Sequence, residues 1–598
     1  MYLSKLKLWN FRKFGSKKFD IESPDFNLDF NKNLNVLIGE NDSGKTAIID
    51  AIKMVLKTHS YEWIRVTEDD FYNNSDRFRI ELEFKDLQPE EAKYFTEWLS
   101  WEGEKEEAEP FLKVNYDVSK NEDRILPSDI RAGSDKDGYP LNAEARHYLK
   151  TTYLKPLRDA ESELIPKRYS RLSQILKGHD IFKDEEDNKL YQEFEKFNEK
   201  ISNYFKKANN EEFQNEGYQI KKVIDEFIRG FYDKDSKSEF RTSEANLRSV
   251  LETLELMISD VDNPGLGTLN RLFMAVELLH LKRDSWPGLK LGLIEELEAH
   301  LHPQVQMKVI EKLQNNNDIQ LILTTHSPNL ASKIKLENLI ICTNDNAFPM
   351  GSDYTELNEK DYIFLEKFLD VTKSNLFFAK GVILVEGWSE EIIIPTLAKE
   401  IGYDLTENEV SVINVGNVGF DHYYKIFLRK DNPDAMNVRV SVVNDVDVTA
   451  YTKDNMEKKD EEFYQIKCKE EITKKKNKIK YLGKSSVEKP QTIVKPFISS
   501  GWTLEWCFYE SDFLNRIFVK STKQVHPQIF DTEDYEEELA IRLLDSNLRF
   551  NKTKIAYQIE ESLRNESVLK GINLNEEETY QDDTISYLIE AIKYACGD

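Results

Sequence analysis

The chain has 598 residues, of which 40% are hydrophobic, and its 82 lysines and arginines against 109 acids leave a net charge of −27. At about 150 residues per domain this length allows roughly three to five domains, and the hydrophobic content excludes a mostly disordered chain. The charge argues against a protein that coats nucleic acid, but not against a local basic track or a site where metal ions offset clustered carboxylates.

Cysteine use and hydropathy indicate the compartment. The four cysteines are scattered without metal-binding spacing, which argues against a disulfide scaffold and a zinc cluster. No apolar run approaches the roughly 18 to 20 residues of a membrane span, and residues 1–14 lack the apolar block of a signal peptide. We therefore expect a cytoplasmic protein with no membrane partner.

The first elements combine strands with one helix. Apolar residues at positions 6, 8, 11 and 14 predict an edge strand and its turn. Residues 34–38 form a short apolar run of β character that stops at Gly39, and helical spacing begins after Thr46. Residues 78–84 alternate apolar and polar side chains, which predicts another strand.

Residues 39–46 fit the phosphate-loop pattern G-x-x-x-x-G-K-[ST], with the required strand before and helix after. The glycines permit a tight loop whose N–H groups point at phosphate, Lys45 reaches the β- and γ-phosphates, and the Thr46 hydroxyl binds Mg²⁺. The sequence thus predicts an ATP site. The predicted nucleotide-binding residues are Gly39, Asn41, Ser43, Gly44, Lys45 and Thr46.

An NTPase also needs carboxylates at a strand end. The apolar run 291–294 ends in Glu295 and Glu296, so we expect Glu295 to hold Mg²⁺, directly or through water, and Glu296 to orient the attacking water. A surface acidic pair at a helix start is the alternative. A second apolar run, 321–323, leads to His326, which at the end of a core strand can sense the γ-phosphate.

The middle of the chain is helical and charge-rich between about residues 184 and 231. One apolar stripe recurs at spacings of 4, 3, 4 and 3, at Leu190, Phe194, Phe197, Ile201 and Tyr204. A seam between helices or between subunits and packing on the same domain fit this stripe equally well. Strands expected at 290–294, 319–323 and 339–342, with helices between them, predict a covered parallel sheet.

A second α/β series begins near Gly381, with strands at 382–385, 410–415 and 438–443 and helices at 390–401 and 422–429. The first strand ends at Glu386, and the third leads to Asp445 and Asp447, which share a face if the strand stays extended. Such carboxylates cannot all stay ionised without cations, and Mg²⁺ prefers oxygen ligands. The sequence therefore predicts a metal site of the kind that supports displacement at phosphorus.

Residues 457–489 are lysine-rich and predict a loop or an extended helix. They fit a phosphate-tracking patch beside the metal site, or a solvated helix face, since Glu470 and Glu471 interrupt them. The lysines are Lys467, Lys469, Lys474, Lys475, Lys476, Lys478, Lys480 and Lys484. Two more helices are expected at 535–545 and 554–563.

The motifs at 10–14, 39–46, 295–303 and 325–328 together resemble the ABC-type ATPase heads of the RecF/SMC/Rad50 group. The resemblance implies that His326 is the switch histidine, that residues 298–303 form the D-loop, and that heads dimerise so that one signature completes the partner's site. The candidate for the signature motif is 265–270, which includes Gly267 but lacks the Ser-Gly-Gly that is usual in the group, so an ordinary helix start is the alternative.

The chain also departs from the group after the acidic pair, where Leu297 stands in place of the usual proline. Arg158–Asp159–Ala160 resembles the start of the group's helical insert, here too short for an SMC or Rad50 arm.

Glu386-Gly387, paired with Asp445-x-Asp447, resembles the Toprim domain, and a head followed by a C-terminal Toprim domain is the arrangement of the OLD (overcoming lysogenization defect) nucleases. This resemblance implies DNA cleavage that depends on Mg²⁺ or Mn²⁺, with two ions at this site. Glu386, Glu390, Asp445, Asp447 and Glu505 then lie at the acidic positions, and Lys552 at the catalytic lysine. Glu391 rivals Glu390, and Lys554 rivals Lys552.

The expected fold is α/β: an ABC-type ATPase domain with a helical insert, followed by a Toprim domain with a parallel sheet. The expected boundaries are 1–160 and 246–365 for the two parts of the ATPase, 161–245 for the insert, which could serve dimerisation, and 366–598 for the Toprim domain.

The leading hypothesis is an ATP-binding and ATP-hydrolysing, metal-dependent DNA endonuclease, with Glu296, His326, Glu386 and Lys552 as catalytic residues. The family context suggests defence against phage, a homodimer or higher even oligomer, and a partner such as a helicase or a retron reverse transcriptase. The alternatives are a RecF-like DNA clamp or repair mediator without nuclease activity, and a topoisomerase-like strand transferase, which needs a tyrosine nucleophile.

Overall fold

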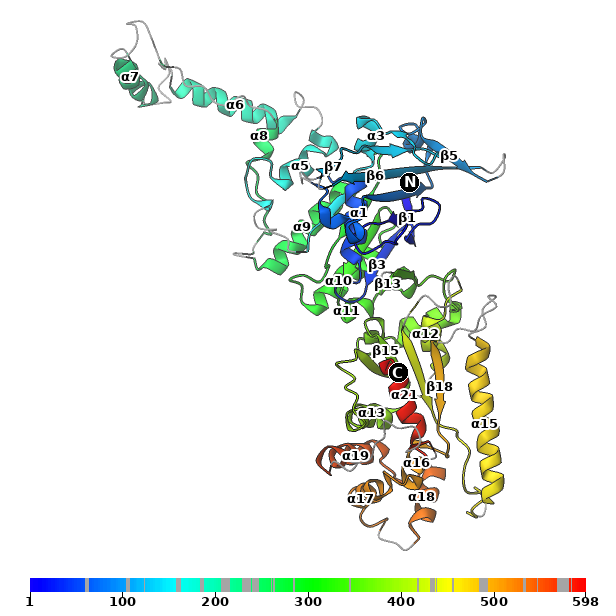
Figure 1. Ribbon diagram of the computed structural model, residues 1–598. Helices are drawn as coiled ribbons and strands as arrows, with labels where there is room; N and C mark the ends of the chain where they lie inside the picture. Colours follow the sequence, from blue (N-terminus) through cyan, green and yellow to red (C-terminus); the bar gives the residue numbers. More distant parts are fainter. Residues whose placement is uncertain are drawn as a thin grey trace.

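The computed structural model describes two α/β units joined by a short connecting segment (Figure 1). The N-terminal unit comprises residues 1–349, the connecting segment 350–380 and the C-terminal unit 381–598. The structure describes all residues except 60–63, 104–107, 123, 157–162, 183–187, 206–215, 229–237, 239–246, 260, 262–263, 283–285, 344–345, 417–418, 431–435, 437, 454–455, 483–492, 531–533, 546, 567–579 and 582. Arg158–Asp159–Ala160 and Lys484 lie outside the described residues. Within the described part, no helix is long and apolar enough to cross a bilayer.

An antiparallel sheet begins the N-terminal unit, in the order β2-β1-β4-β6-β8-β9, with β5 and β7 also paired to β6. Its strands are β1 (Tyr2–Trp9), β2 (Phe26–Asp29), β4 (Arg77–Lys85), β5 (Leu99–Glu102), β6 (Glu109–Asn121), β7 (Arg124–Ile125), β8 (Ile130–Ala132) and β9 (Tyr139–Pro140). The predicted edge position of β1 is wrong, because β2 pairs with its second edge at Leu6↔Leu28. The strand predicted at 78–84 is confirmed as β4.

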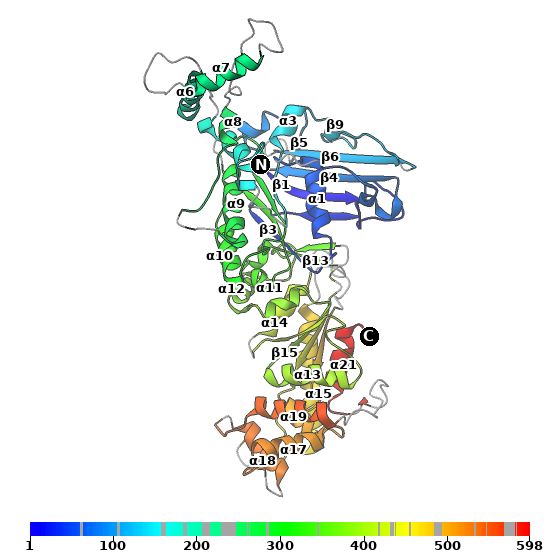
Figure 2. The ribbon, with the colours of Figure 1, turned by 90° about the vertical axis from the view of Figure 1, so that its left-hand side faces the viewer.

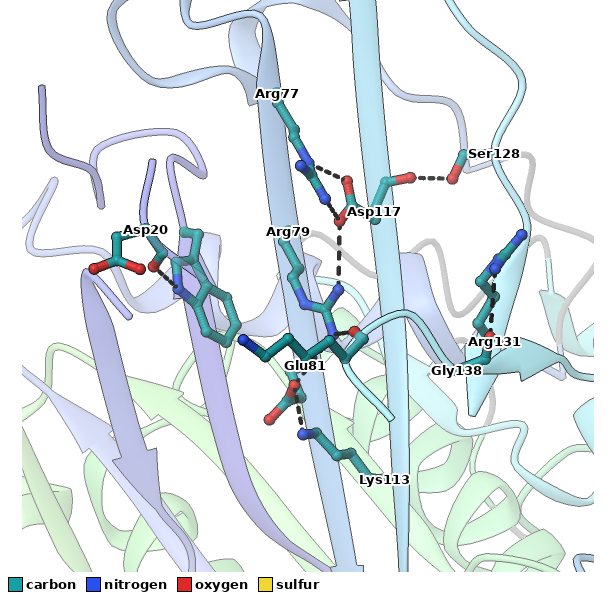
Figure 3. A network of polar contacts seen from close by, with 11 residues as sticks. Asp20, Arg77, Arg79, Glu81, Lys113, Asp117, Ser128, Arg131 and Gly138 are labelled. Atoms are coloured by element: carbon teal, nitrogen blue, oxygen red, sulfur yellow. Dashed lines mark hydrogen bonds and ion pairs between the residues drawn. The ribbon is translucent and has the colours of Figure 1, made fainter. Parts of the chain in front are cut away.

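A network of charged side chains ties the neighbouring strands of this sheet together (Figure 3). Arg77 Nε and Nη2 donate to the Asp117 carboxylate across β4 and β6, at 2.7 and 2.5 Å. Arg79 is only 1% exposed and donates to Lys136 O at 2.7 Å. Glu81 beside it is held by Lys7 and Lys113, so buried charges on β4 are paired rather than isolated.

The second sheet has the order β10-β11-β12-β3-β13-β14 and is parallel except for β14. Its strands are β10 (Thr152–Leu154), β11 (Leu291–Ile294), β12 (Gln320–Thr325), β3 (Leu34–Ile38), β13 (Leu339–Thr343) and β14 (Asn346–Pro349). The four predicted apolar runs are confirmed as β3, β11, β12 and β13, and all residues of β3, β11 and β12 are buried. Helix α1 (Lys45–Leu56) shares one hydrophobic core with the antiparallel sheet, and α9 (Leu266–Leu281) and α10 (Pro303–Gln314) share another with β12.

The insert forms an arm that projects from the N-terminal unit, with α6 and α7 at its far end (Figures 1 and 2). Its helices are α5 (Arg171–Lys177), α6 (Lys189–Tyr204), α7 (Glu216–Ile228) and α8 (Leu247–Leu251). The helical prediction is confirmed, but α6 buries no residue fully, and Phe197 and Val223 are 54% and 53% exposed. The described part of this chain therefore covers the apolar stripe only in part, and leaves Leu190 and Phe197 exposed.

The C-terminal unit is built on a four-stranded parallel sheet in the order β16-β15-β17-β18. Its strands are β15 (Gly381–Val385), β16 (Val410–Asn414), β17 (Arg439–Asn444) and β18 (Val494–Ile498), and its helices are α13 (Trp388–Glu400), α14 (Phe420–Tyr424), α15 (Glu461–Leu482), α16 (Leu504–Glu510), α17 (Asn515–Val525), α18 (Tyr535–Leu544), α19 (Lys552–Glu566) and α21 (Ser586–Cys596). The first three predicted strands are confirmed. The helix predicted at 422–429 is shorter, since α14 passes into a 3₁₀ turn at Lys425–Phe427.

Two short helices lie between the units. Helix α12 (Glu359–Phe368) and the turn Lys373–Phe377 lead from β14 to β15. Asp361 at the start of α12 is buried and accepts from His422 Nδ1 at 2.6 Å and Lys425 Nζ at 3.1 Å. This cluster anchors the connecting segment to the C-terminal unit.

Candidate functional site

The phosphate loop lies between β3 and α1, as its motif requires. Gly39 has φ +148°, and a Cβ there would lie 2.2 Å from Cys342 O. Gly44 has φ +102°, and a Cβ would lie 2.6 Å from the Phe14 ring. Both positions need glycine, because a side chain would meet both a left-handed backbone and a filled space.

Lys45 is folded over the loop that it terminates. Its Nζ donates to Gly39 O at 2.9 Å and to Glu40 O and Ser43 Oγ at 2.5 and 3.0 Å. Burial lowers the pKa of this ammonium, although the nearby carboxylates oppose the shift. The loop carbonyls therefore hold the cation at the position where a phosphate could accept its hydrogen bonds. Asn41 and Thr46 are exposed.

Glu295 and Glu296 stand at the end of β11. Glu295 is buried, accepts from the Tyr153 hydroxyl at 3.3 Å, and has its pKa raised to about 7, chiefly by burial and then by Asp50. Glu296 is more accessible, has φ +45°, and donates its amide to Thr324 Oγ1 at 3.0 Å. A left-handed glutamate is uncommon, and such backbone strain is concentrated at functional sites.

His326 follows β12 and completes this group. Its amide donates to Glu298 Oε1 at 2.6 Å, in the predicted D-loop. Burial and the charge of Lys45 lower the imidazole pKa, against Glu298, Glu296 and a hydrogen bond to the Gly39 backbone. The structure thus brings His326, Glu296 and Lys45 together at the carboxyl ends of three neighbouring strands.

Gly267 lies in the first turn of α9. A Cβ there would be 2.6 Å from His300 O, and Asn270 Nδ2 donates to Ala299 O at 3.4 Å. The candidate signature is therefore a helix N-terminus placed against the predicted D-loop.

Four carboxylates act on one another at the carboxyl edge of the C-terminal sheet: Glu386, Glu390, Asp445 and Glu505. Burial raises the pKa of Glu390 to about 7, and Glu505 and Glu386 add to the shift. Burial and then Glu390, Glu505 and Glu386 raise the pKa of Asp445 well above its ordinary value. Glu386 also has a raised pKa, and its buried Oε2 has no hydrogen-bond partner.

One lysine holds a carboxylate of this cluster, and a second lysine lies at its edge. Lys552 Nζ donates to Glu505 Oε2 at 2.8 Å. Burial alone would lower the Lys552 pKa, but Glu505, Asp445 and Glu390 raise it overall. Lys475 Nζ of α15 donates to Asp447 Oδ2 and to Asp445 O, both at 2.6 Å.

The expectation that Asp445 and Asp447 share a strand face is wrong. Strand β17 ends at Asn444, and Asp447 has φ +61°, so the extended geometry does not persist. Asp445 faces the other carboxylates, whereas the Asp447 side chain is 63% exposed and held by Lys475.

The structure separates the rival positions. Glu391 Oε2 accepts from Asn414 Nδ2 at 2.9 Å, on β16, while Glu390 is 8% exposed and faces the cluster. Lys554 is exposed, and its backbone amide is bonded to Asn551 Oδ1. Glu390 and Lys552 are therefore the members of each pair that the cluster contains.

The donor set of the cluster fits a divalent cation. Burial and mutual repulsion raise the pKa of Glu390 and of Asp445, and the buried Glu386 Oε2 has no hydrogen-bond partner; a divalent ion would offset this crowding of negative charge. As the described side chains stand, no three His, Cys, Asp or Glu groups form a ready metal-binding cluster.

The lysine-rich segment is the helix α15 along one side of the C-terminal unit (Figure 1). Besides Lys475, three of its lysines are paired with acids: Lys467 with Glu470, Lys474 with Glu471, and Lys478 with Asp421. These pairs reduce the positive field expected of the patch. The contact of Lys475 with Asp447 is one that sequence reasoning missed, because 28 residues separate the two and no spacing rule connects them.

The phosphate loop also meets the connecting segment. A cavity of about 320 Å³ is lined by residues 39–43 of the loop and by residues 376–380. Lys380 pairs with Glu409 and lies 4.0 Å from Glu40 Oε2, so one cation links the loop to the first residues of the C-terminal sheet.

Comparison with known proteins gives two matching families. Residues 1–331 match the family described as AAA ATPase domain, and residues 377–447 match the TOPRIM domain of overcoming lysogenization defect protein-like proteins. Among solved structures, an SMC head bound to the C-terminal winged-helix domain of ScpA covers 59% of this chain and 98% of its own, at 17% identity and a TM-score of 0.35.

Three curated relatives differ in how much they share with the chain. The uncharacterized protein YbjD of Escherichia coli is 23% identical over 66% of this chain and 73% of its own length. Endonuclease GajA of Bacillus cereus (strain HuB5-5) is 28% identical over 34% of this chain and 32% of its own, and the OLD nuclease of Thermus scotoductus is 27% identical over 22% and 27%. The matches thus span about a third or less of the two named nucleases. Because the ATPase match covers more than half of the chain, the chain belongs to the AAA ATPase domain family, and its residues 377–447 match an OLD-like TOPRIM domain that follows the ATPase domain.

Proposed function

We propose that this protein is an ATP-binding and ATP-hydrolysing DNA endonuclease that depends on Mg²⁺ or Mn²⁺. The observation that carries the proposal is the cluster of Glu386, Glu390, Asp445 and Glu505, with Lys552 bonded to Glu505, at one edge of a parallel sheet. Relatives named endonuclease GajA and OLD nuclease support the same activity.

At this site the carboxylates would hold divalent ions, which lower the charge of the phosphate and activate the attacking water. Glu390 and Asp445 would bind such an ion as carboxylates, because the charge of the ion would offset the cost of burying their negative charge. Lys552 would stabilise the charge of the transition state with its ammonium. Asp447, which is exposed and lies two residues after Asp445, would add a further ligand.

At the phosphate loop, Lys45 would bind the β- and γ-phosphates, while Thr46 and Glu295 would hold Mg²⁺. Glu296 would orient the attacking water, and His326 would sense the γ-phosphate from beside Lys45. Gly267 would complete the site of a second protomer, so the active form is at least a homodimer. The exposed apolar stripe on the arm supports contact with a second copy through α6 and α7.

Coupling between the two sites runs through Lys380, which lies between the phosphate loop and β15. We propose that nucleotide occupancy is reported to the Toprim domain there. We propose defence against phage as the setting, with a helicase or retron component as partner. The retron Ec83 probable ATPase of Escherichia coli, which is 37% identical over 62 residues, supports a retron component.

A RecF-like clamp is the second candidate, because RecF of Francisella tularensis is 29% identical over 29% of this chain. A clamp does not need the Toprim carboxylates, which favours the nuclease. A strand transferase would need an accessible tyrosine beside the carboxylate cluster. Tyr587 lies within electrostatic reach of Asp445, Glu390 and Glu505, but its side chain is only 5% exposed.

Cleavage of supercoiled plasmid tests the proposal. Wild type is expected to cut with Mg²⁺ or Mn²⁺ and to stop in EDTA, and Lys552→Met should lower the rate about 100-fold or more. Lys554→Met is the matched control and should cut normally. If no metal supports cleavage the nuclease proposal is wrong, and if only Lys554→Met is inactive the catalytic lysine is misassigned.

A further inference from the structure

Lys475 differs from the other lysines of α15 in its contacts. Its side chain is 22% exposed, compared with 76% for the adjacent Lys474. Its ammonium donates to Asp447 Oδ2 and to Asp445 O at 2.6 Å, across 28 and 30 residues of sequence. Lys474 instead pairs with Glu471 on its own helix. Helix α15 thus positions the ammonium of Lys475 at the edge of the carboxylate cluster.

The electrostatic effect of Lys475 extends beyond Asp447. Burial and Asp447 raise the Glu386 pKa, and Lys475 opposes that shift. Lys552 plays the matching part on the other side, where it holds Glu505. Two ammonium groups from two different helices therefore lie beside the cluster. The pKa values of Glu386, Glu390 and Asp445 remain raised in their presence.

We propose that Lys475 is the resident counter-ion of the Asp445–Asp447 segment, and that a divalent ion must displace it from Asp447. The inference rests on the proposed function only in placing the metal at this cluster. An ammonium and a metal ion compete for one carboxylate, because each takes the same oxygen lone pairs and the two repel each other. Ion binding consequently frees the Lys475 side chain and loosens the contact between α15 and the Asp447 turn.

This competition predicts in which direction the apparent metal affinity changes when Lys475 is replaced. The ion pair between Lys475 and Asp447 stabilises only the metal-free form. The free energy of this ion pair is therefore subtracted from the free energy of metal binding. For an ion pair with one exposed partner, this corresponds to roughly a five-fold weaker apparent metal affinity. Removing the ammonium should therefore tighten binding, whereas a lysine that helped to build the metal site would have the opposite effect.

Titration of the full chain with Mn²⁺ alone, without DNA or nucleotide, tests the inference by calorimetry. Asp445→Asn identifies the signal of this cluster as the binding that it abolishes. Lys475→Met should bind Mn²⁺ about five-fold more tightly at that site, and Lys475→Arg should stay near wild type. Lys474→Met is the matched control on the same helix and should be unchanged. Lys475→Gln replaces Lys475→Met if thermal melting in EDTA shows that the latter does not fold.

Equal or weaker Mn²⁺ binding by Lys475→Met would overturn the inference, as would the absence of any binding that Asp445→Asn abolishes. The titration does not depend on DNA cleavage, so the two proposals can fail separately. Tighter binding by Lys475→Met in a chain that cuts no DNA would leave the counter-ion inference standing and refute the nuclease. Cleavage by wild type without tighter binding in Lys475→Met would do the reverse.

Discussion

Two buried glutamates, Glu295 and Glu390, stand at the ends of sheet strands in separate units, and each has a pKa near 7. Both lie beside other acids in places where burial disfavours charge. Sequence predicted their positions from strand ends and motif resemblance. It could not predict their protonation, which depends on groups far apart in the chain, such as Asp50 beside Glu295 and Glu505 beside Glu390.

The raised pKa of Glu390 predicts an unusual pH dependence of stability in EDTA. Between its ordinary pKa of 4.5 and about 7, the folded form holds a proton that the unfolded chain has lost, so the free energy of unfolding falls as pH rises. The accumulated loss is up to about 3 kcal/mol. Glu390→Gln should remove this loss and be more stable than wild type at pH 8, as measured by urea unfolding.

Glu391→Gln is the matched control, because Glu391 points at Asn414 on β16. It should keep the wild-type dependence. A wild-type chain whose stability rises between pH 5 and 7 in parallel with Glu390→Gln would show that Glu390 is ionised in the folded metal-free form.

At the ATPase site, Glu296→Gln should abolish hydrolysis while leaving ATP binding intact. Its strained backbone places the carboxylate beyond β11, and an amide cannot polarise water in the same way. We expect the hydrolysis rate to fall by about 10²- to 10⁴-fold. Phosphate release and nucleotide binding should be measured on one preparation, and near-normal hydrolysis would assign the water-orienting role elsewhere.

At the scale of elements, the sequence predicted the strands and helices that a short-range pattern of apolar residues determines. These are the apolar runs of β3, β11, β12, β15 and β17 and the helical spacing of α1 and α6. The place of β1 inside its sheet depends on β2, whose Phe26–Asp29 carries little pattern of its own. Helix α21 was missed for a similar reason, since its burial against β15 and β17 is a tertiary effect and its residues are hydrophobic on more than one side.

The arm supplies a prediction at this scale. The double variant Phe197→Asp with Val223→Asp places charges on the exposed apolar side of α6 and α7 and should weaken self-association at least tenfold. Lys200→Asp with Lys222→Asp places the same charges on exposed polar positions of these helices and should not. Analytical ultracentrifugation checks this, and dimers that survive the first variant unchanged would exclude the arm from the interface.

For the whole molecule, the phosphate loop meets the residues that lead into the C-terminal sheet through a small contact surface, at the end of β15 opposite to the carboxylate cluster. The 320 Å³ cavity between residues 39–43 and residues 376–380 places the nucleotide loop against the entry to the Toprim sheet. Lys380 joins Glu40 of the loop to Glu409, which precedes β16. No sequence pattern predicted this contact, because each side is ordinary surface until the two units are placed together.

Replacing Lys380 should therefore uncouple the sites without damaging either one. In Lys380→Ala, the ratio of cleavage rates with and without ATP should move toward one, while ATP hydrolysis and metal-dependent cleavage persist. Lys399→Ala on α13 removes a similarly exposed lysine, paired with Asp404, and is the control. A wild-type ratio in Lys380→Ala would place the coupling elsewhere.

If the chain carries two separate catalytic centres, as we propose, a paired measurement should show that each can be lost without the other. Plasmid cleavage and ATP hydrolysis are followed in the same reaction with Mg²⁺ or Mn²⁺ for wild type, Asp445→Asn and Lys45→Ala. We expect Asp445→Asn to lose cleavage and keep ATP hydrolysis, whereas Lys45→Ala should lose ATP hydrolysis and show how cleavage responds. Cleavage by Asp445→Asn at the wild-type rate would refute a catalytic centre at the Toprim carboxylates.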